Sequence, residues 1–147
     1  MSFEEIRSNF EMLEDWEDRY RYVMELGREL PPFDEALRTD ATKVRGCASQ
    51  VWLVSRLAPD PQDGPPRMRF SGDSDAHIVR GLIAILFSLI EGRTAREILN
   101  CNPAQAFDSL GLKEHLTPQR SNGLASMIRR IEADAKQALE ADASAGS

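Results

Sequence analysis

The sequence predicts an α+β fold in which helices cover a small antiparallel sheet of two to three strands. Apolar residues recur at helical spacing near both ends of the chain, within 3–28 and 75–135. Between these regions, a β-branched and aromatic run at 50–57 and an alternating run at 67–71 are typical of strands. The proline- and glycine-rich segment 59–66 separates the two runs, which indicates a hairpin with a long tip.

Two short amphipathic helices are predicted before the sheet. A capping box at 2–5 begins the first, and its apolar residues recur at helical spacing up to Leu13. The second begins at Asp15 and ends near Gly27, because a glycine and the pair Pro31–Pro32 oppose its continuation. Both helices are expected to pack their apolar faces on the rest of the fold.

The connection from 33 to 45 shows no steady period and is expected to be irregular, apart from a third short strand at 43–45. The segment 72–75 is expected to end the hairpin, and its aspartates are expected to cap the following helix. That helix, over 75–91, has the widest apolar stripe and should be the most buried.

Three further helix starts are marked by caps. Thr94–Glu97 is a capping box for a short helix through Leu99. Asn102–Pro103 and Thr117–Pro118 each place a cap before a proline at the first helical position, and Gly111 ends the segment between them. The final helix is therefore predicted to begin at Pro118.

Composition indicates one domain over 1–140, followed by a small, polar and frayed tail at 141–147. The chain has 147 residues, of which 41% are hydrophobic and 29% charged, as in ordinary globular proteins. No apolar run approaches a membrane span, and the acidic N-terminus is unlike a secretory signal, so we expect a cytoplasmic protein that does not bind membranes. The net charge of −6 argues against a nucleic-acid partner.

The two cysteines, Cys47 and Cys101, are too few for a disulfide framework. Together with His77 and His115 they are too evenly scattered to show the ligand spacing of a zinc site. We therefore expect neither a resident metal nor a cofactor. Cys101, between two capped segments, is interpreted as structural.

Cys47 lies where irregular chain meets the first strand. Gly46 permits backbone angles closed to other residues, and Ala48–Ser49 leave space beside the sulfur. A buried small hydrophobe explains such a cysteine, and so do four chemistries: a cysteine hydrolase, a rhodanese-like sulfurtransferase, an iron–sulfur scaffold and a single-cysteine sulfur carrier. The carrier needs least, because one accessible thiolate suffices.

Four blocks of sequence resemble the SufE-type sulfur acceptors. The segment 46–52, G-C-A-S-Q-V-W, is similar to the family signature G-C-x-S-Q-V-W, and W-E-D-R-Y at 16–20 with E-L-G at 25–27 resembles its N-terminal elements. G-D-S-D-A at 72–76 and H-L-T-P-Q-R-S-N-G-L at 115–124 resemble two further elements. The matches run in order over nearly the whole chain.

This resemblance implies a fold shared with IscU-type cluster scaffolds and a function in sulfur transfer. Cys47 would accept sulfane sulfur from a pyridoxal-phosphate cysteine desulfurase as a persulfide. The protein would stimulate that enzyme and deliver the sulfur to an iron–sulfur cluster scaffold. A cluster scaffold of the same fold and a desulfurase regulator that carries no sulfur are the alternatives. The protein would be a transfer protein, as a monomer or weak homodimer, rather than a stand-alone enzyme.

Supporting roles are expected for a few residues around the cysteine. Gly46 would let the loop hide or expose the sulfur, and Arg120 would lie beside the loop or on the docking face. Asp73 and Asp75 are helix caps or, in the minority interpretation, close the resting loop or contribute to docking. Arg45 and Arg120 are candidate sources of positive potential for a moderately lowered thiol pKa. Trp52 and Leu53 are interpreted as core residues or, in the minority interpretation, one of them is the wall of an apolar pocket.

Overall fold

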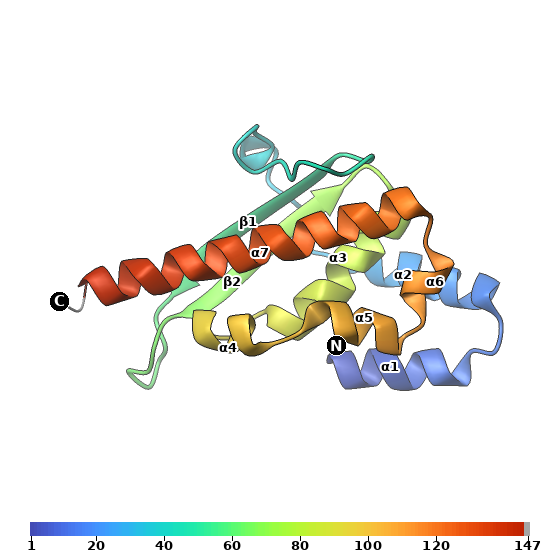
Figure 1. Cartoon of the computed structure of the whole chain (residues 1–147), viewed down its shortest axis with the longest axis horizontal. Helices are drawn as coiled ribbons and strands as arrows, with labels where there is room; N and C mark the ends of the chain where they lie inside the picture. Colours follow the sequence, from blue (N-terminus) through green and yellow to red (C-terminus); the bar gives the residue numbers. More distant parts are fainter. Residues whose placement is uncertain (146–147) are drawn as a thin grey trace.

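The computed structural model describes residues 1–145, with side chains up to 141, as a two-stranded sheet surrounded by helices (Figure 1). Gly146–Ser147 lie outside the described residues. The elements in chain order are α1 Phe3–Met12, α2 Trp16–Arg28, the 3-10 turn η1 Glu35–Leu37, β1 Val51–Ala58, β2 Arg67–Ser74, α3 His77–Ile90, α4 Ala95–Asn100, α5 Pro103–Ser109, α6 Leu112–His115 and α7 Pro118–Ala145.

The predicted α+β class and the hairpin are confirmed. Strands β1 and β2 pair antiparallel in a register that runs from Val51 opposite Ser74 to Ala58 opposite Arg67. The third strand predicted at 43–45 is wrong: only an isolated bridge joins Lys43 to Trp52. This connection touches the outer edge of β1 through two backbone hydrogen bonds and then leaves it, which is too short a pairing to make a strand.

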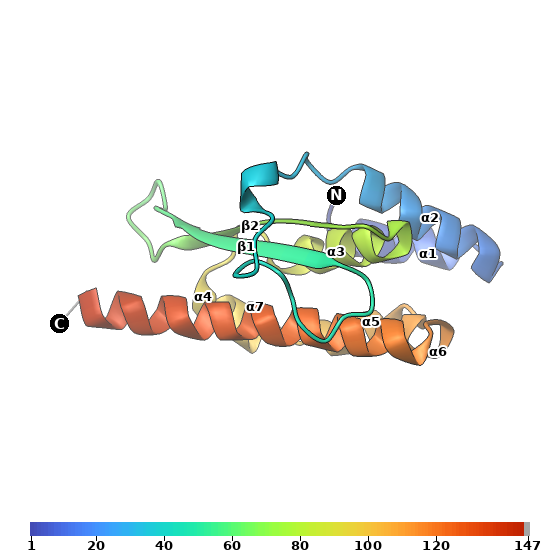
Figure 2. The same ribbon diagram turned by 90° about the horizontal axis from the view of Figure 1, so that it is seen from above.

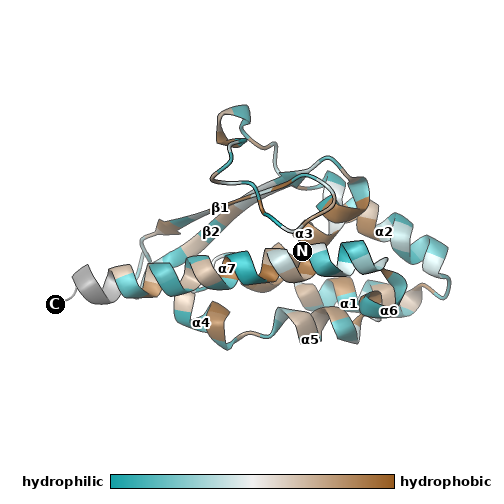
Figure 3. Ribbon diagram, turned by 45° about the horizontal axis from the view of Figure 1, so that its top comes forward, coloured by the Kyte–Doolittle hydropathy of each residue, from teal (hydrophilic) through white to brown (hydrophobic). Residues whose placement is uncertain are grey.

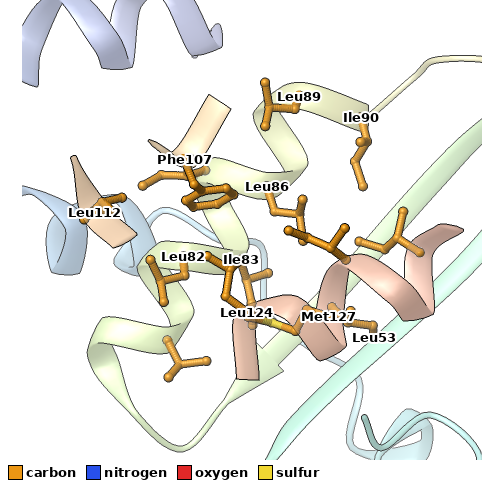
Figure 4. Close-up of a cluster of buried hydrophobic side chains, with 14 of the residues drawn as sticks. Leu53, Leu82, Ile83, Leu86, Leu89, Ile90, Phe107, Leu112, Leu124 and Met127 are labelled. Carbon is orange, nitrogen blue, oxygen red and sulfur yellow. The ribbon is translucent and has the colours of Figure 1, made fainter. Parts of the chain in front are cut away.

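Helix α3 forms the centre of the core, as its apolar stripe predicts. Leu82, Ile83, Ile85, Leu86 and Ile90 are completely buried. Figure 4 shows part of this cluster, in which side chains of α3 meet Phe107 of α5, Leu53 of β1 and Leu124 and Met127 of α7. The core therefore lies between the sheet, α3 and the C-terminal helices.

The close approach of α2 and α3 depends on two glycines. A Cβ atom built on Gly81 would lie 2.1 Å from the carbonyl oxygen of Val23, and one on Gly27 would lie 2.6 Å from the backbone nitrogen of Gly81. Because both obstacles are backbone atoms, neither can move aside independently. The two helices thus pack backbone against backbone. Gly27, which was expected to end α2, lies inside the helix and serves this contact instead.

The start of α3 differs from the prediction. Strand β2 continues to Ser74, and the helix begins at His77 with Ala76 as its N-cap, a residue whose side chain cannot accept a capping hydrogen bond. The prediction that Asp73 and Asp75 cap this helix is therefore wrong. Both carboxylates have other partners, because the strand continues through this segment and fixes its backbone as part of the sheet.

The predicted C-terminal caps are present. Thr94 and Glu97 form a capping box, Asn102 caps α5, and the Thr117 hydroxyl accepts a hydrogen bond from the Arg120 backbone at 3.2 Å. The short α6 was not predicted. Helix α7 begins at Pro118 as expected and is assigned up to Ala145, and the end of the predicted tail, 146–147, lies outside the described residues.

Helix α7 lies along one side of the sheet, and η1 with its flanking chain lies on the other (Figure 2). Hydrophobic and hydrophilic residues alternate along α7 as expected for a helix with one buried face (Figure 3). Within the described residues, no helix combines the length and the apolarity that crossing a membrane requires.

Candidate functional site at Cys47

The segment between η1 and β1 leaves the sheet, crosses α7 and returns to the start of β1 (Figure 2). Gly46 lies at this crossing with a φ of +88°, a backbone conformation that L side chains rarely adopt. A Cβ at this position would lie 2.6 Å from the hydroxyl oxygen of buried Ser126. Gly46 is therefore needed both for its backbone angle and for close contact with α7.

Cys47 faces α7 one residue later. Its thiol donates a long hydrogen bond, 3.5 Å, to the carbonyl oxygen of Gly123. A Cβ on Gly123 would lie 3.5 Å from the sulfur and 3.7 Å from the Cys47 Cβ. Both distances are ordinary van der Waals contacts, so the Cys47 side chain packs directly against the backbone of α7 at Gly123.

A cavity of about 20 Å³ adjoins the sulfur. Volume of this order holds one water-sized group. Its walls come from α3, α7 and the loop itself, and they are mainly apolar: Val51, Val79, Leu82, Leu124 and Met127, with Ala48, Ser49, Gln119 and Arg120 toward the loop and the start of α7. The site can therefore enclose one additional small atom bound to Cys47.

Neither Trp52 nor Leu53 lines this cavity, so the minority interpretation of these residues as pocket walls is wrong. Leu53 is a core residue, and Trp52 points to the opposite face of the sheet, where the Arg38 guanidinium lies 4.7 Å from its ring centroid. Successive residues of a strand alternate between faces, so Val51 lines the cavity and Trp52 cannot. The walls from α3 and α7 were missed, although Gly123 belongs to one of the recognised sequence blocks.

Burial raises the pKa of the Cys47 thiol above its ordinary value. Desolvation disfavours the thiolate, and the raised pKa shows that positive charge from Arg120 or Arg45 does not offset this effect in the resting structure. The condition under which transfer needs no general base, a moderately lowered pKa, is therefore not met in the resting structure. The resting loop holds Cys47 as a neutral, half-buried thiol.

This raised pKa predicts slow alkylation of Cys47 in the folded protein. At a given pH, iodoacetamide should modify Cys47 more slowly in the folded protein than in the urea-unfolded chain, because less thiolate is present. The pH range in which the alkylation rate rises should also lie higher for the folded protein than for the unfolded chain. Mass spectrometry of the peptide containing Cys47, over a pH series with and without urea, measures both profiles. Coincident profiles would contradict the prediction.

Asp75 fixes the end of the Cys47 loop. Its carboxylate accepts a hydrogen bond of 3.0 Å from the Gln50 N–H, and its own N–H donates to the Gln50 carbonyl at 3.3 Å. These two bonds join the loop end to the turn between β2 and α3. The minority interpretation, in which this carboxylate holds the resting loop, agrees with this geometry.

Asp73 holds the chain that precedes the loop. Its carboxylate accepts a 2.6 Å hydrogen bond from Arg38 and lies 3.1 Å from Nε of Arg80, although this second ion pair lacks hydrogen-bond geometry. Because Arg38 follows η1 and Arg80 is in α3, Asp73 links the connection on one face of the sheet to the core helix. Asp73 thus supports the site without touching Cys47.

Arg120 and Arg45 lie on opposite sides of the Cys47 loop. Arg120 is exposed and lines the cavity at the start of α7. Arg45 is also exposed and lines a different, open pocket beside the loop. Among the residues that the structure describes, neither side chain forms an ion pair.

The other cysteine and the two histidines are not part of this site. Cys101 follows α4 as its C-cap and packs against the core, in agreement with a structural role. His115 stacks on Trp16 with ring centroids 3.6 Å apart, and His77 is exposed at the start of α3. In the described part of the chain, no group of three or more histidine, cysteine, aspartate or glutamate residues could hold a metal ion.

Comparisons with known proteins give one consistent family. The model of the SufE family, described as an Fe-S metabolism associated domain, matches residues 4–135. An uncharacterized SufE-like protein of Rhizobium meliloti is 51% identical over 95% of this chain and 99% of its own length. An uncharacterized SufE-like protein of Rhizobium etli is 53% identical over 92% of this chain and 90% of its own length.

A solved structure agrees on the fold. The solution structure of a hypothetical protein from Thermus thermophilus superposes with a TM-score of 0.73, covers 95% of this chain and 99% of its own, and is 21% identical. At this identity the likeness concerns the fold alone. The family model and the relatives carry the assignment: the chain belongs to the SufE family, and its domain is associated with iron–sulfur metabolism.

Proposed function

We propose that this protein is a cytoplasmic sulfur carrier, in which Cys47 accepts sulfane sulfur from a pyridoxal-phosphate cysteine desulfurase. The protein stimulates that enzyme and delivers the sulfur to an iron–sulfur cluster scaffold. The observation that carries the proposal is the position of Cys47 in the family's G-C-x-S-Q block, beside a mainly apolar cavity of about 20 Å³. The cavity can shelter one added sulfur atom, which is what a persulfide carrier needs between loading and delivery.

The transfer step is a thiol–disulfide type of exchange. The Cys47 thiolate attacks the outer sulfur of the desulfurase persulfide, the sulfur–sulfur bond of the donor breaks, and the donor cysteine leaves as a thiolate. The product is a persulfide on Cys47, and no external oxidant is consumed. Attack requires both a thiolate and access to the sulfur.

The resting geometry opposes both requirements. Burial raises the thiol pKa, and Cys47 faces α7 instead of solvent. We therefore propose that docking on the desulfurase draws the loop away from Gly123 and solvates or charges the thiol. Gly46 is the natural pivot, because glycine tolerates large changes of φ.

A carrier accounts for the site better than a cluster scaffold does. A cluster needs several soft ligands around its irons, whereas Cys47 has Gly123, aliphatic side chains and Arg120 as neighbours. Reconstitution with iron and sulfide tests the scaffold alternative directly. A stable stoichiometric cluster lost in Cys47→Ser would favour the scaffold.

One experiment tests the carrier proposal. The protein is mixed with a cysteine desulfurase and L-cysteine, and its peptides are mapped by mass spectrometry under non-reducing conditions. We expect one additional sulfur atom on the peptide containing Cys47 and none on the peptide containing Cys101. Sulfur on Cys101 alone, or on neither cysteine, would contradict the proposal.

Arg120→Ala is expected to weaken desulfurase stimulation several-fold and to leave thermal stability nearly unchanged. The side chain is exposed, and a cation in the first turn of α7 opposes the helix dipole by about 0.3–1 kcal/mol, so its loss costs the fold little. Its place at the cavity edge suggests that it acts on the incoming persulfide or partner.

Desulfurase turnover and thermal melts of the same batch measure the two effects. Arg96→Ala, which removes an exposed arginine of α4, is the matched control. A large fall in melting temperature would give Arg120 a structural role, and unchanged turnover would make it an ordinary surface charge.

A further inference from the structure

A basic pocket lies on the other side of the Cys47 loop from Arg120. It is an open pocket of about 390 Å³ between the loop and α7, and its charged lining residues are Lys43, Arg45, Arg129 and Arg130 against Asp40. Four cations therefore face one carboxylate, in a chain whose net charge is −6. The positive charge is concentrated beside the candidate sulfur-accepting residue.

Most of this charge is not neutralised within the protein. Lys43, Arg45 and Arg129 are exposed, and among the described residues they make no ion pair. Arg130 is different, because it pairs with Asp134 and donates a 2.7 Å hydrogen bond to the Ala41 carbonyl. Arg130 thus anchors the connection to α7, and the other three cations remain available to a partner.

The pocket is joined structurally to the Cys47 loop. Arg129 donates a 3.1 Å hydrogen bond to the Ser126 hydroxyl, and this same oxygen is the atom that a Cβ on Gly46 would meet at 2.6 Å. Arg45 is two residues before Cys47 in the chain. A group bound in this pocket therefore lies beside the segment that carries the sulfur-accepting residue.

We infer that the basic pocket, together with Arg120 across the loop, is a docking surface for an acidic face of the cysteine desulfurase. The inference rests on the proposed function, which requires a protein to cover this loop during transfer. Carboxylates of the partner would pair with the exposed cations of the pocket. An acidic protein face is favoured over a nucleic-acid phosphate backbone because the proposed function requires a protein partner, and no step of it requires a nucleic acid.

The test is the rate of association with the desulfurase in the absence of L-cysteine, so that no sulfur is transferred. Lys43→Glu with Arg45→Glu reverses two exposed charges that have no side-chain hydrogen bond among the described residues. At about 50 mM salt we expect the association rate constant to fall about tenfold, because rim charges act mainly through electrostatic steering. The difference from wild type should shrink as salt is raised.

Arg56→Glu with Arg96→Glu is the matched control, because it gives the same net charge. Both residues are exposed and lie outside the basic pocket, on β1 and α4. We expect the control to bind nearly as fast as wild type. Equal slowing in both double variants would mean that net charge alone matters and would overturn the inference, as would no slowing in either.

Two further results separate this inference from other possibilities. Binding of a labelled single-stranded oligonucleotide by wild type but not by the Lys43/Arg45 variant would assign the pocket to nucleic acid and overturn the inference. Persulfide mapping of wild type tests the proposed function separately. If Cys47 accepts no sulfur but the charge reversal still slows association, the docking surface stands and the carrier function fails.

Discussion

Cys47→Ser is expected to abolish sulfur acceptance from the desulfurase and to leave the fold intact. Serine occupies slightly less space, and the only polar contact that the described structure gives the thiol is a 3.5 Å hydrogen bond to Gly123, so little stability depends on the sulfur. A hydroxyl is not the nucleophile of persulfide exchange, whereas the thiolate is. The loss should therefore be complete, beyond the several-fold change expected for Arg120→Ala.

Non-reducing mass spectrometry measures the persulfide, and thermal melts measure the fold. Cys101→Ser is the matched control, since it removes the other thiol, and it should accept sulfur like wild type. Persulfide that persists after Cys47→Ser would contradict the assignment. If Cys47→Ala still stimulated the desulfurase fully, the protein would be a regulator that carries no sulfur.

Gly81→Ala is expected to be strongly destabilising, although alanine favours helix formation by about 1 kcal/mol relative to glycine. The added Cβ would lie 2.1 Å from the Val23 carbonyl oxygen and 2.4 Å from the Val23 Cγ1. Helices α2 and α3 would have to separate, which exposes core side chains. Overpacking of this kind costs about 1–3 kcal/mol, and an obstacle made of backbone atoms places Gly81 at the upper end of this range. After the gain of about 1 kcal/mol in helix propensity, we expect a net loss of about 2 kcal/mol.

Urea titration followed by far-UV circular dichroism measures this loss. Gly123→Ala is the matched helical control, because its added methyl would lie at an ordinary contact distance, 3.5 Å, from the Cys47 sulfur. The control should keep its stability or gain up to about 1 kcal/mol from helix propensity. An unchanged stability of Gly81→Ala would show that α2 and α3 do not pack as closely as the structure indicates.

Local chemistry made much of the fold predictable. The Ser2 cap of α1, the Thr94–Glu97 capping box of α4, the proline at the start of α5 and of α7, and the change from helical to alternating periodicity depend only on neighbouring residues, so the sequence determined these elements. The unusual loop chemistry of 46–49 also singled out Cys47. The recognised sequence blocks supplied the family, which the comparisons confirm.

The environment of Cys47 was decided by tertiary structure. Gly123 and Leu82 are distant from Cys47 in sequence, and only the packing of α7 and α3 brings them to the sulfur. The sequence suggested a lowered thiol pKa from nearby arginines, but burial raises it, because desolvation depends on everything packed around the group.

The same reason explains the two aspartates. A carboxylate before a helix has the local pattern of a cap, so Asp73 and Asp75 were assigned that role from sequence. In the folded chain β2 extends past the expected turn, and the carboxylates bind Arg38 and the Gln50 N–H. The sequence by itself determined which residues are candidates for the chemistry, whereas long-range packing decided what each one contacts, because partners far apart in the chain meet only after folding.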